Sequence, residues 1–410
     1  MTWTRRRLLQ AGSLEALAPT ACPSIAQAAV PIKVGSLLDL SGPIGSTGQP
    51  MYDAIRLAAD EVNANGGLLG RKVELINYDT QSNIALYSQY AQRLALQDRV
   101  DVVHGGITSA SREAIRPVFD RYRVLYFYNV LYEGGVCDLD CYCTGTTPAQ
   151  TVSKLVEYAL KTWGKKVYIV AADYNYGQIT AKWMEKYARD GGGEVQAVEF
   201  FPLDVTSFSA SISKIETAKP DVLLSALVGS NHTAFYRQWA AAGMKTRIPI
   251  SSTTFGLVNE LATLDPAVSD GIVTAYGYFQ ELRNPQNAAF LDAIHKKFGA
   301  DVPYSSEPAA TTYEGFHLWA EGVRKASSIE RLKLIKALDQ GVSIVGPSGP
   351  VAIDPASHQT IRNAYLGKAV GRKWDVIATF PHQEPADTQA VCNLLKNPRT
   401  DKQFVINVKT

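Results

Sequence analysis

The sequence predicts an α/β protein made of two similar lobes, each built on a largely parallel sheet. Apolar strand-like runs alternate with amphipathic helix-like runs along most of the 410 residues, which is typical of right-handed βαβ units. After about residue 150 the alternation restarts and continues for a similar length. No stretch rich in Pro, Gly or Ser separates the two series. We therefore expect short crossings of the chain, and not a flexible tether, to join the lobes.

The first series predicts four strands and three helices. Its first helix ends at Gly66-Gly67, which suits the left-handed backbone of a helix C-cap. The expected strands are 32–38, 72–78, 100–104 and 124–127, and the expected helices are 51–65, 82–97 and 109–121.

The second series has the same character and is followed by a mixed C-terminal part. Its expected helices are 151–163, 178–190, 207–218 and 232–242, and its expected strands are 166–172, 194–201, 222–227, 248–251 and 271–276. The C-terminal part predicts helices 287–298, 308–325 and 328–338, then strands 342–345, 351–353, 364–369 and 374–378. We expect these last pieces to return to the two lobes and complete them.

Charge and hydropathy argue against binding to nucleic acids and against insertion into a membrane. The chain has 41 Lys and Arg against 39 Asp and Glu, a net charge of +2, which gives no reason to expect nucleic-acid or anionic-membrane binding. After the N-terminal segment, no run is long and apolar enough to span a bilayer, so direct membrane insertion is not expected.

The N-terminus predicts export. Thr4-Arg5-Arg6-Arg7-Leu8-Leu9 is a basic region of twin-arginine type, a short apolar stretch follows, and Ala26-Gln27-Ala28 fits a signal-peptidase site. We therefore assign residues 1–28 to a signal peptide and expect a periplasmic protein. Cys22 offers a weaker alternative as a lipoprotein site, and the general export route stays open beside the twin-arginine route.

Four cysteines remain in the mature chain, and three of them fall in one window of seven residues. Cys137, Cys141 and Cys143 form this cluster, and Cys392 stands alone. In an oxidising compartment we expect a local disulfide that joins Cys137 to Cys141 or to Cys143. The window lacks paired C-x-x-C spacing and has no nearby histidine, so no metal site is expected.

Polar and tyrosine-bearing loops follow several of the predicted strands. In open α/β sheets, ligands bind beyond the carboxyl ends of the strands, so such loops on both lobes predict a cleft between them. For Ser109 and for Asp173 the alternative is an ordinary helix N-cap. The candidate ligand-binding residues are Thr108, Ser109, Tyr128, Val130, Asp173, Tyr174, Tyr176, Ser230 and Tyr278.

Catalytic patterns are weak by comparison. The sequence has no G-x-S-x-G, H-E-x-x-H or P-loop motif, and His104 at a strand end is interpreted as a packing histidine. An amidase that uses Cys143 is the enzymatic alternative. We expect no enzyme activity and no cofactor.

Several stretches together resemble one protein family. They are Ile32-Lys33-Val34-Gly35, Ser41-Gly42, Ala59-Asp60-Glu61-Val62-Asn63, Thr108-Ser109-Ala110-Ser111-Arg112, Tyr132-Glu133-Gly134, Thr144-Gly145-Thr146-Thr147-Pro148-Ala149-Gln150 and Ser348-Gly349-Pro350-Val351. Over residues 31–380 the chain resembles the type I periplasmic solute-binding proteins of ABC transporters, in the branched-chain amino acid, urea and short-chain amide group.

The resemblance implies two Rossmann-like lobes joined by three crossings, with lobe 1 at 29–147 plus 278–345 and lobe 2 at 148–277 plus 346–410. It implies a substrate-binding component that delivers urea, a short-chain amide or an amino acid-like solute to permease subunits. It also implies ligand roles for the Thr-Ser pair, for the residues before Tyr-Glu-Gly and for the Asp-Tyr loop. Ile107 and Gly177-Gln178 depart from the urea-binding pattern, so the solute stays open. An amide or urea sensor on the same scaffold is the alternative function.

Overall fold

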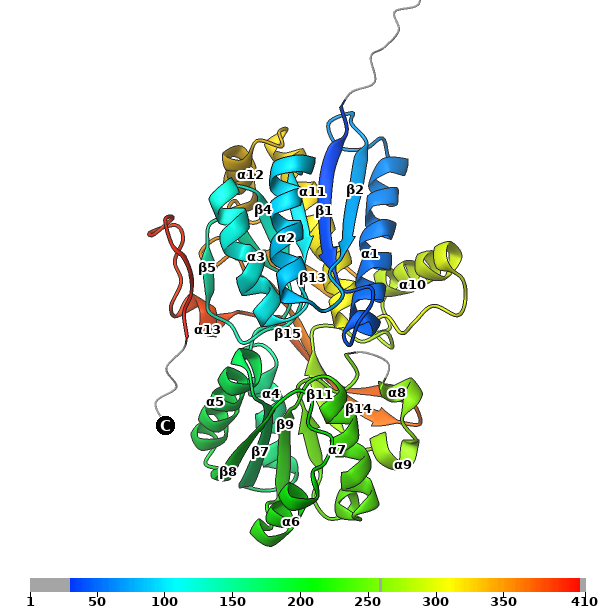
Figure 1. Ribbon diagram of the computed structural model, residues 1–410, viewed down its shortest axis with the longest axis vertical. Coiled ribbons are helices and arrows are strands. Elements are labelled where there is room, and N and C mark those ends of the chain that lie inside the picture. The colour runs from blue at the N-terminus through cyan, green and yellow to red at the C-terminus, as the bar shows by residue number, and fades with distance from the viewer. Residues whose placement is uncertain (1–29, 258–259, 406–410) are drawn as a thin grey trace, which may run out of the picture.

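The computed structural model describes residues 30–257 and 260–405 and shows two α/β lobes, one above the other in Figure 1. The predicted signal peptide lies outside these residues. In the upper lobe five parallel strands stand in the order β2-β1-β3-β4-β6. These strands are β1 (Ile32–Leu38), β2 (Val73–Asp79), β3 (Val102–Gly105), β4 (Leu125–Tyr128) and β6 (Cys141–Cys143).

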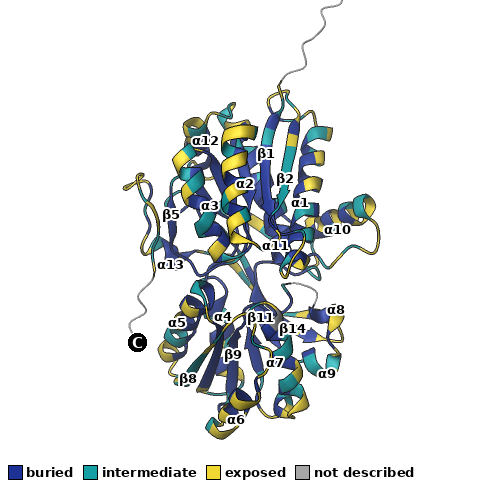
Figure 2. Cartoon of the chain, viewed as in Figure 1, coloured by how far each residue is buried: buried dark blue, intermediate teal, exposed yellow. Residues whose placement is uncertain are grey.

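Helices cover both faces of the upper sheet because successive strand residues point to opposite sides. Val34 and Val102 face one core with the helices α1 (Gly45–Ala64), α11 (Glu307–Ala326) and α12 (Arg331–Leu338). Leu37 and Val103 face the other core with α2 (Ile84–Arg93) and α3 (Ser109–Tyr122). Helix α10 (Pro285–Phe298) packs beside α1. Buried strands and outward-facing exposed helix residues give the layered pattern of Figure 2.

The lower lobe holds the parallel strands β8-β7-β9-β10-β11. Helices α4 and α5 cover one face of this sheet, and α6 and α7 cover the other. The elements are α4 (Val152–Thr162), β7 (Lys166–Ala172), α5 (Asn175–Asp190), β8 (Glu194–Phe201), α6 (Ser209–Ala218), β9 (Val222–Ala226), α7 (Ser230–Ala241), β10 (Ile250–Ser252), α8 (Glu260–Thr263), α9 (Pro266–Ser269) and β11 (Val273–Tyr276).

A long C-terminal hairpin links the two lobes. Strand β14 (Thr360–Val370) pairs at its start with β13 (Gly349–Ile353) and further along with β11, and β15 (Lys373–Gln383) pairs with β14 along its length. Strand β13 continues to β12 (Ser343–Gly346), and its residues Val351 and Ile353 pack in the upper core. One mixed sheet of nine strands therefore reaches from the lower lobe into the upper one.

The chain passes between the lobes at the ends of these sheets. It goes down from β6 to α4, up from β11 to α10, and down again from β13 into β14. After β15 it returns once more, through α13 (Ala386–Gln389), to the upper lobe, where β16 (Asp401–Gln403) pairs with β5 (Val136–Asp138). Figure 1 shows this last segment along the outer side of the upper lobe. The predicted two-lobe α/β fold is confirmed, and the lobe boundaries stay a prediction.

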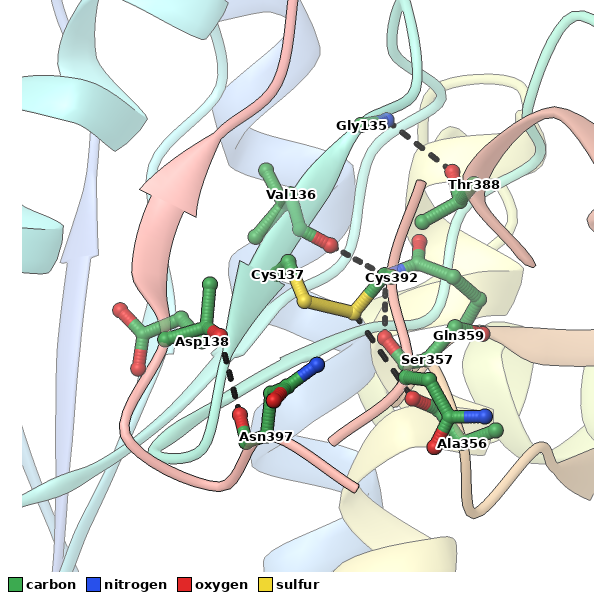
Figure 3. The surroundings of a disulfide bond; sticks show 12 residues. Gly135, Val136, Cys137, Asp138, Ala356, Ser357, Gln359, Thr388, Cys392 and Asn397 are labelled. Carbon is green, nitrogen blue, oxygen red and sulfur yellow. Dashed lines mark hydrogen bonds between the residues drawn. A yellow bond between two sulfur atoms is a disulfide. The ribbon is translucent and has the colours of Figure 1, made fainter. Parts of the chain in front are cut away.

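The disulfide prediction is wrong. Cys137 bonds to Cys392, with 5.4 Å between the two Cα atoms, while Cys141 and Cys143 are buried free thiols (Figure 3). Cys141 and Cys143 are alternate residues of β6 and turn the same way into the upper core. Cys137 lies on β5 and packs against Cys392 and Leu394. Although the three cysteines are close in sequence, Cys137 packs in a different cluster from Cys141 and Cys143, so a local disulfide does not form.

Candidate functional site

A cavity of about 270 Å³ lies between the lobes, at the carboxyl ends of strands from both sheets. Its upper wall comes from the start of α1, from the segments after β3 and β4, and from α11, while its lower wall comes from the segments after β7, β9 and β10. The upper wall consists of Pro43, Ile44, Ser46, Thr47, Ile107, Thr108, Ser109, Tyr128, Val130, Leu131 and Pro308, and the lower wall of Tyr174, Tyr176, Val228, Gly229, His232, Thr233, Thr254, Leu257, Glu260 and Thr263.

Six of the nine residues expected to bind ligand line this cavity together. They are Thr108, Ser109, Tyr128, Val130, Tyr174 and Tyr176. Asp173 is exposed, accepts a hydrogen bond from the Gln178 amide at 2.8 Å, and is not part of the lining. Tyr278 is buried beside α10 and donates to Asn287 at 2.7 Å. Ser230 begins α7 next to the lining residue Gly229, and nothing of its side chain is described.

The start of α3 presents backbone N–H groups at the upper wall. Thr108 is the N-cap, its hydroxyl accepts from the Ser111 N–H at 3.1 Å, and the Ser111 hydroxyl accepts in return from the Thr108 N–H at 3.1 Å. The next two N–H groups, of Ser109 and Ala110, have no acceptor within the helix because a helix leaves its first donors unpaired. This end of α3 therefore suits an anionic oxygen.

A buried ion pair fixes the position of that helix start. Glu133 accepts from the Ser109 hydroxyl and, at 2.8 Å, from the Arg112 guanidinium, and the side chains of Arg112 and Glu133 are both fully buried. The guanidinium also lies 5.0 Å from the ring centre of Tyr128 and 4.7 Å from that of Tyr132. Ser109 thus lines the cavity while its hydroxyl proton is held by Glu133.

Tyrosine rings form much of the remaining wall. The Tyr128 hydroxyl donates to the Ile107 carbonyl at 2.8 Å, so Tyr128 offers its ring and not its hydroxyl to the cavity. Opposite it, the rings of Tyr174 and Tyr176 are 6.1 Å apart, and the Tyr176 hydroxyl donates to Thr253 at 3.1 Å. Burial raises the pKa of the Tyr174 hydroxyl well above its usual value, so that hydroxyl stays protonated.

A second buried pair lies in the lower wall. His232 Nε2 is 2.9 Å from a carboxylate oxygen of Glu260, and the other oxygen accepts from the Gly256 N–H at 3.1 Å. Neither residue, nor the α1 segment, is predicted from the sequence pattern. Residues 253–257 after β10 are irregular, and Glu260 belongs to the short helix α8, so no strand end predicted it. Within residues 30–257 and 260–405, no group of three or more His, Cys, Asp or Glu is placed to hold a metal ion.

A family model described as periplasmic binding protein matches residues 31–373. Leu/Ile/Val-binding protein homolog 6 of Brucella melitensis is 26% identical over 369 residues, which cover 86% of this chain and 91% of that protein.

Solved structures of other proteins share the fold. A solute-binding protein of an ABC transporter from Rhodopseudomonas palustris, in complex with 3,4-dihydroxybenzoic acid, is 25% identical, covers 86% of this chain and 98% of its own, and superposes with a TM-score of 0.76. The branched-chain amino acid transporter substrate binding protein LivJ from Streptococcus pneumoniae, in complex with isoleucine, is 22% identical, covers 87% of this chain and 100% of its own, and has a TM-score of 0.74.

Proposed function

The chain belongs to the periplasmic binding protein family and is a solute-binding component of an ABC importer, not an enzyme. We propose that its cavity takes a small organic acid with an apolar or aromatic body. The observation that carries this proposal is the start of α3. There, unpaired N–H groups and the Thr108 side chain border a cavity whose other walls are mainly aliphatic side chains and tyrosine rings.

The carboxylate of such an acid would accept from the Ser109 and Ala110 N–H groups, where the helix dipole favours negative charge. Its body would lie between Tyr128 above and Tyr174 and Tyr176 below, because aromatic rings bury large apolar area and stack on one another. A polar group at its far end would meet the Tyr174 hydroxyl or the His232–Glu260 pair. The relative from R. palustris, which binds a dihydroxybenzoic acid, supports this solute class.

An α-amino acid is the second candidate, and Glu260 is the observation that favours it. An ammonium group needs an acidic acceptor, and Glu260 is the carboxylate among the described lining residues. One of its oxygens lies 2.9 Å from His232 Nε2 and the other accepts from the Gly256 N–H, so an ammonium would have to share both. Urea and short-chain amides fit less well, since they have no apolar body to cover the tyrosine and aliphatic walls.

We infer further that the mature protein works in the periplasm and delivers its solute to permease subunits. The N-terminal basic region and Ala26-Gln27-Ala28 support export. None of the helices in the described ranges is long and apolar enough to cross a membrane. Fractionation of cells that express the full chain tests this, and an uncleaved N-terminus in the cytoplasmic fraction would contradict it.

Calorimetric titration of the mature protein tests the solute class. The panel pairs each acid with its amide: benzoate with benzamide, 4-hydroxybenzoate with 4-hydroxybenzamide, and leucine with leucinamide, with urea and acetamide added. If α3 binds a carboxylate, each acid of the preferred class binds at least tenfold more tightly than its amide, because the amide loses the charge-assisted hydrogen bonds. Equal binding of an acid and its amide, or selective binding of urea, would overturn the proposal.

A further inference from the structure

We propose that residues 386–403, here called the C-terminal strap, position the solute site from outside the cavity, and that the Cys137–Cys392 disulfide holds the strap in place. This inference rests on the proposed function, since it assigns a role to residues behind the same cavity wall. The family match ends at residue 373, so the strap lies beyond the part of the chain that the match covers.

The strap is fastened to the upper lobe by several contacts. The disulfide joins it to β5, and strand β16 pairs antiparallel with β5. The Leu394 N–H donates to the Ala356 carbonyl at 2.7 Å. Beyond β16, the Phe404 N–H donates to the Gly135 carbonyl at 2.7 Å. Figure 3 shows the disulfide between β5 and the strap, with the Gly135 N–H directed at the Thr388 hydroxyl 3.0 Å away.

Gln403 connects the strap to the solute site. Its side-chain amide donates to one oxygen of Glu133, the same oxygen that Arg112 binds, while the other oxygen accepts from Ser109. Ser109 is the first residue of α3 and lines the cavity. A fully buried carboxylate needs its hydrogen-bond partners, because a buried charge that loses one pays a desolvation cost. Gln403 is therefore a positioning residue that acts on the solute through Glu133 and Ser109.

The strap also touches the first crossing between the lobes. The Asp387 carboxylate, 5% exposed, accepts from the Thr147 hydroxyl at 2.8 Å and from the Ala149 N–H at 2.9 Å. These two residues lie between β6 in the upper lobe and α4 in the lower lobe. One segment thus contacts both the helix start that faces the solute, through Glu133, and the first connection between the lobes.

The first test compares Gln403→Ala with Lys402→Ala, a neighbour on β16 whose side chain is exposed. With 4-hydroxybenzoate as the probe in calorimetry, Gln403→Ala should raise the dissociation constant about fivefold, and Lys402→Ala should leave it unchanged. In a Ser109→Ala background the Gln403→Ala effect should disappear, because the path through Ser109 is already cut. Effects that simply add in the double variant, or an unchanged affinity in Gln403→Ala, would overturn the proposal.

The second test does not depend on knowing the solute. Amide hydrogen exchange of residues 107–113 should be faster in Gln403→Ala, in Cys392→Ser and in the wild-type protein after reduction with dithiothreitol than in the untreated protein or in Lys402→Ala. If the wild-type protein binds no acid, the proposed solute class is wrong, and this exchange measurement alone decides on the strap. Equal exchange in all these samples would overturn the strap proposal whatever the solute is.

Discussion

His104 should make the upper lobe lose stability as the pH falls below about 6.5, the ordinary pKa of histidine. It is 0% exposed, it stacks on Phe127 with 4.8 Å between ring centres, and Phe316 and Trp319 lie near it. The Asn129 side-chain nitrogen is 3.3 Å from Nδ1, an arrangement that makes Nδ1 an acceptor in the neutral ring. Burial lowers the pKa of His104 to about 3.

The sign and size follow from linkage between protonation and folding. Between pH 6.5 and pH 3 the unfolded chain binds a proton at His104 that the folded chain does not. The stability that the neutral, buried His104 provides is therefore fully present above pH 6.5 and is lost as the pH falls toward 3. A pH of 5 lies about 1.5 units below the pKa of His104 in the unfolded chain. This difference corresponds to a loss of about 2 kcal/mol of unfolding free energy.

Urea denaturation of wild type and His104→Leu, each at pH 7.5 and pH 5, measures this contribution. The leucine variant is expected to be less stable at pH 7.5 by about 1–3 kcal/mol, since Asn129 loses its acceptor, but that cost does not change with pH. The wild type should lose about 2 kcal/mol more than the variant between the two pH values. Other titrating groups are present in both proteins and cancel. Parallel losses in the two proteins would refute the reasoning.

Three further predictions concern a buried pair, the disulfide and the cavity wall. Arg362→Met should destabilise the fold by about 3–5 kcal/mol in urea denaturation, because it leaves the buried Glu314 carboxylate, which Arg362 binds at 2.6 Å, without its cationic partner. Adding Glu314→Leu should recover part of this loss. Cys392→Ser should lower the unfolding free energy by about 2–5 kcal/mol, since the bond closes a sequence separation of 255, and an unchanged melting temperature on reduction of the wild type would contradict this. Asp173→Ala should leave solute affinity unchanged within about twofold, whereas Tyr174→Ala should weaken it about tenfold through lost ring contact. If calorimetry shows the larger loss of affinity in Asp173→Ala, the binding role belongs to Asp173.

The sequence predicted the fold because two periodic signals agree over most of the chain. Buried parallel strands such as β7 and β9 are short continuous apolar runs, and the helices between them are amphipathic, so each lobe is read from local pattern alone. The same logic located most of the cavity wall, since the carboxyl ends of parallel strands meet at one edge of a sheet.

The cavity lining differs from the residues expected at the site where side-chain direction matters more than position along the chain. Tyr174 has extended backbone, with φ −155° and ψ 175°, and Tyr174 and Tyr176 both face the cavity, while Asp173 just before them is exposed to solvent. A loop at a strand end therefore predicts a site but not which of its side chains enter it. Glu260 is the opposite case: it lines the cavity from a short helix, and no strand end predicts it.

The pairing of Cys137 with Cys392 lies beyond local pattern for a physical reason. A disulfide forms where tertiary packing brings two Cβ atoms together, and here that packing depends on the chain returning to the upper lobe after β15. Nothing in the cysteine spacing signals this return, and the contacts of Gln403 with Glu133 and of Asp387 with Thr147 depend on it equally. The strap therefore adds its hydrogen bonds to a site whose walls the rest of the fold already sets, so changes in the strap should alter how tightly the solute is held before they alter which solute is chosen.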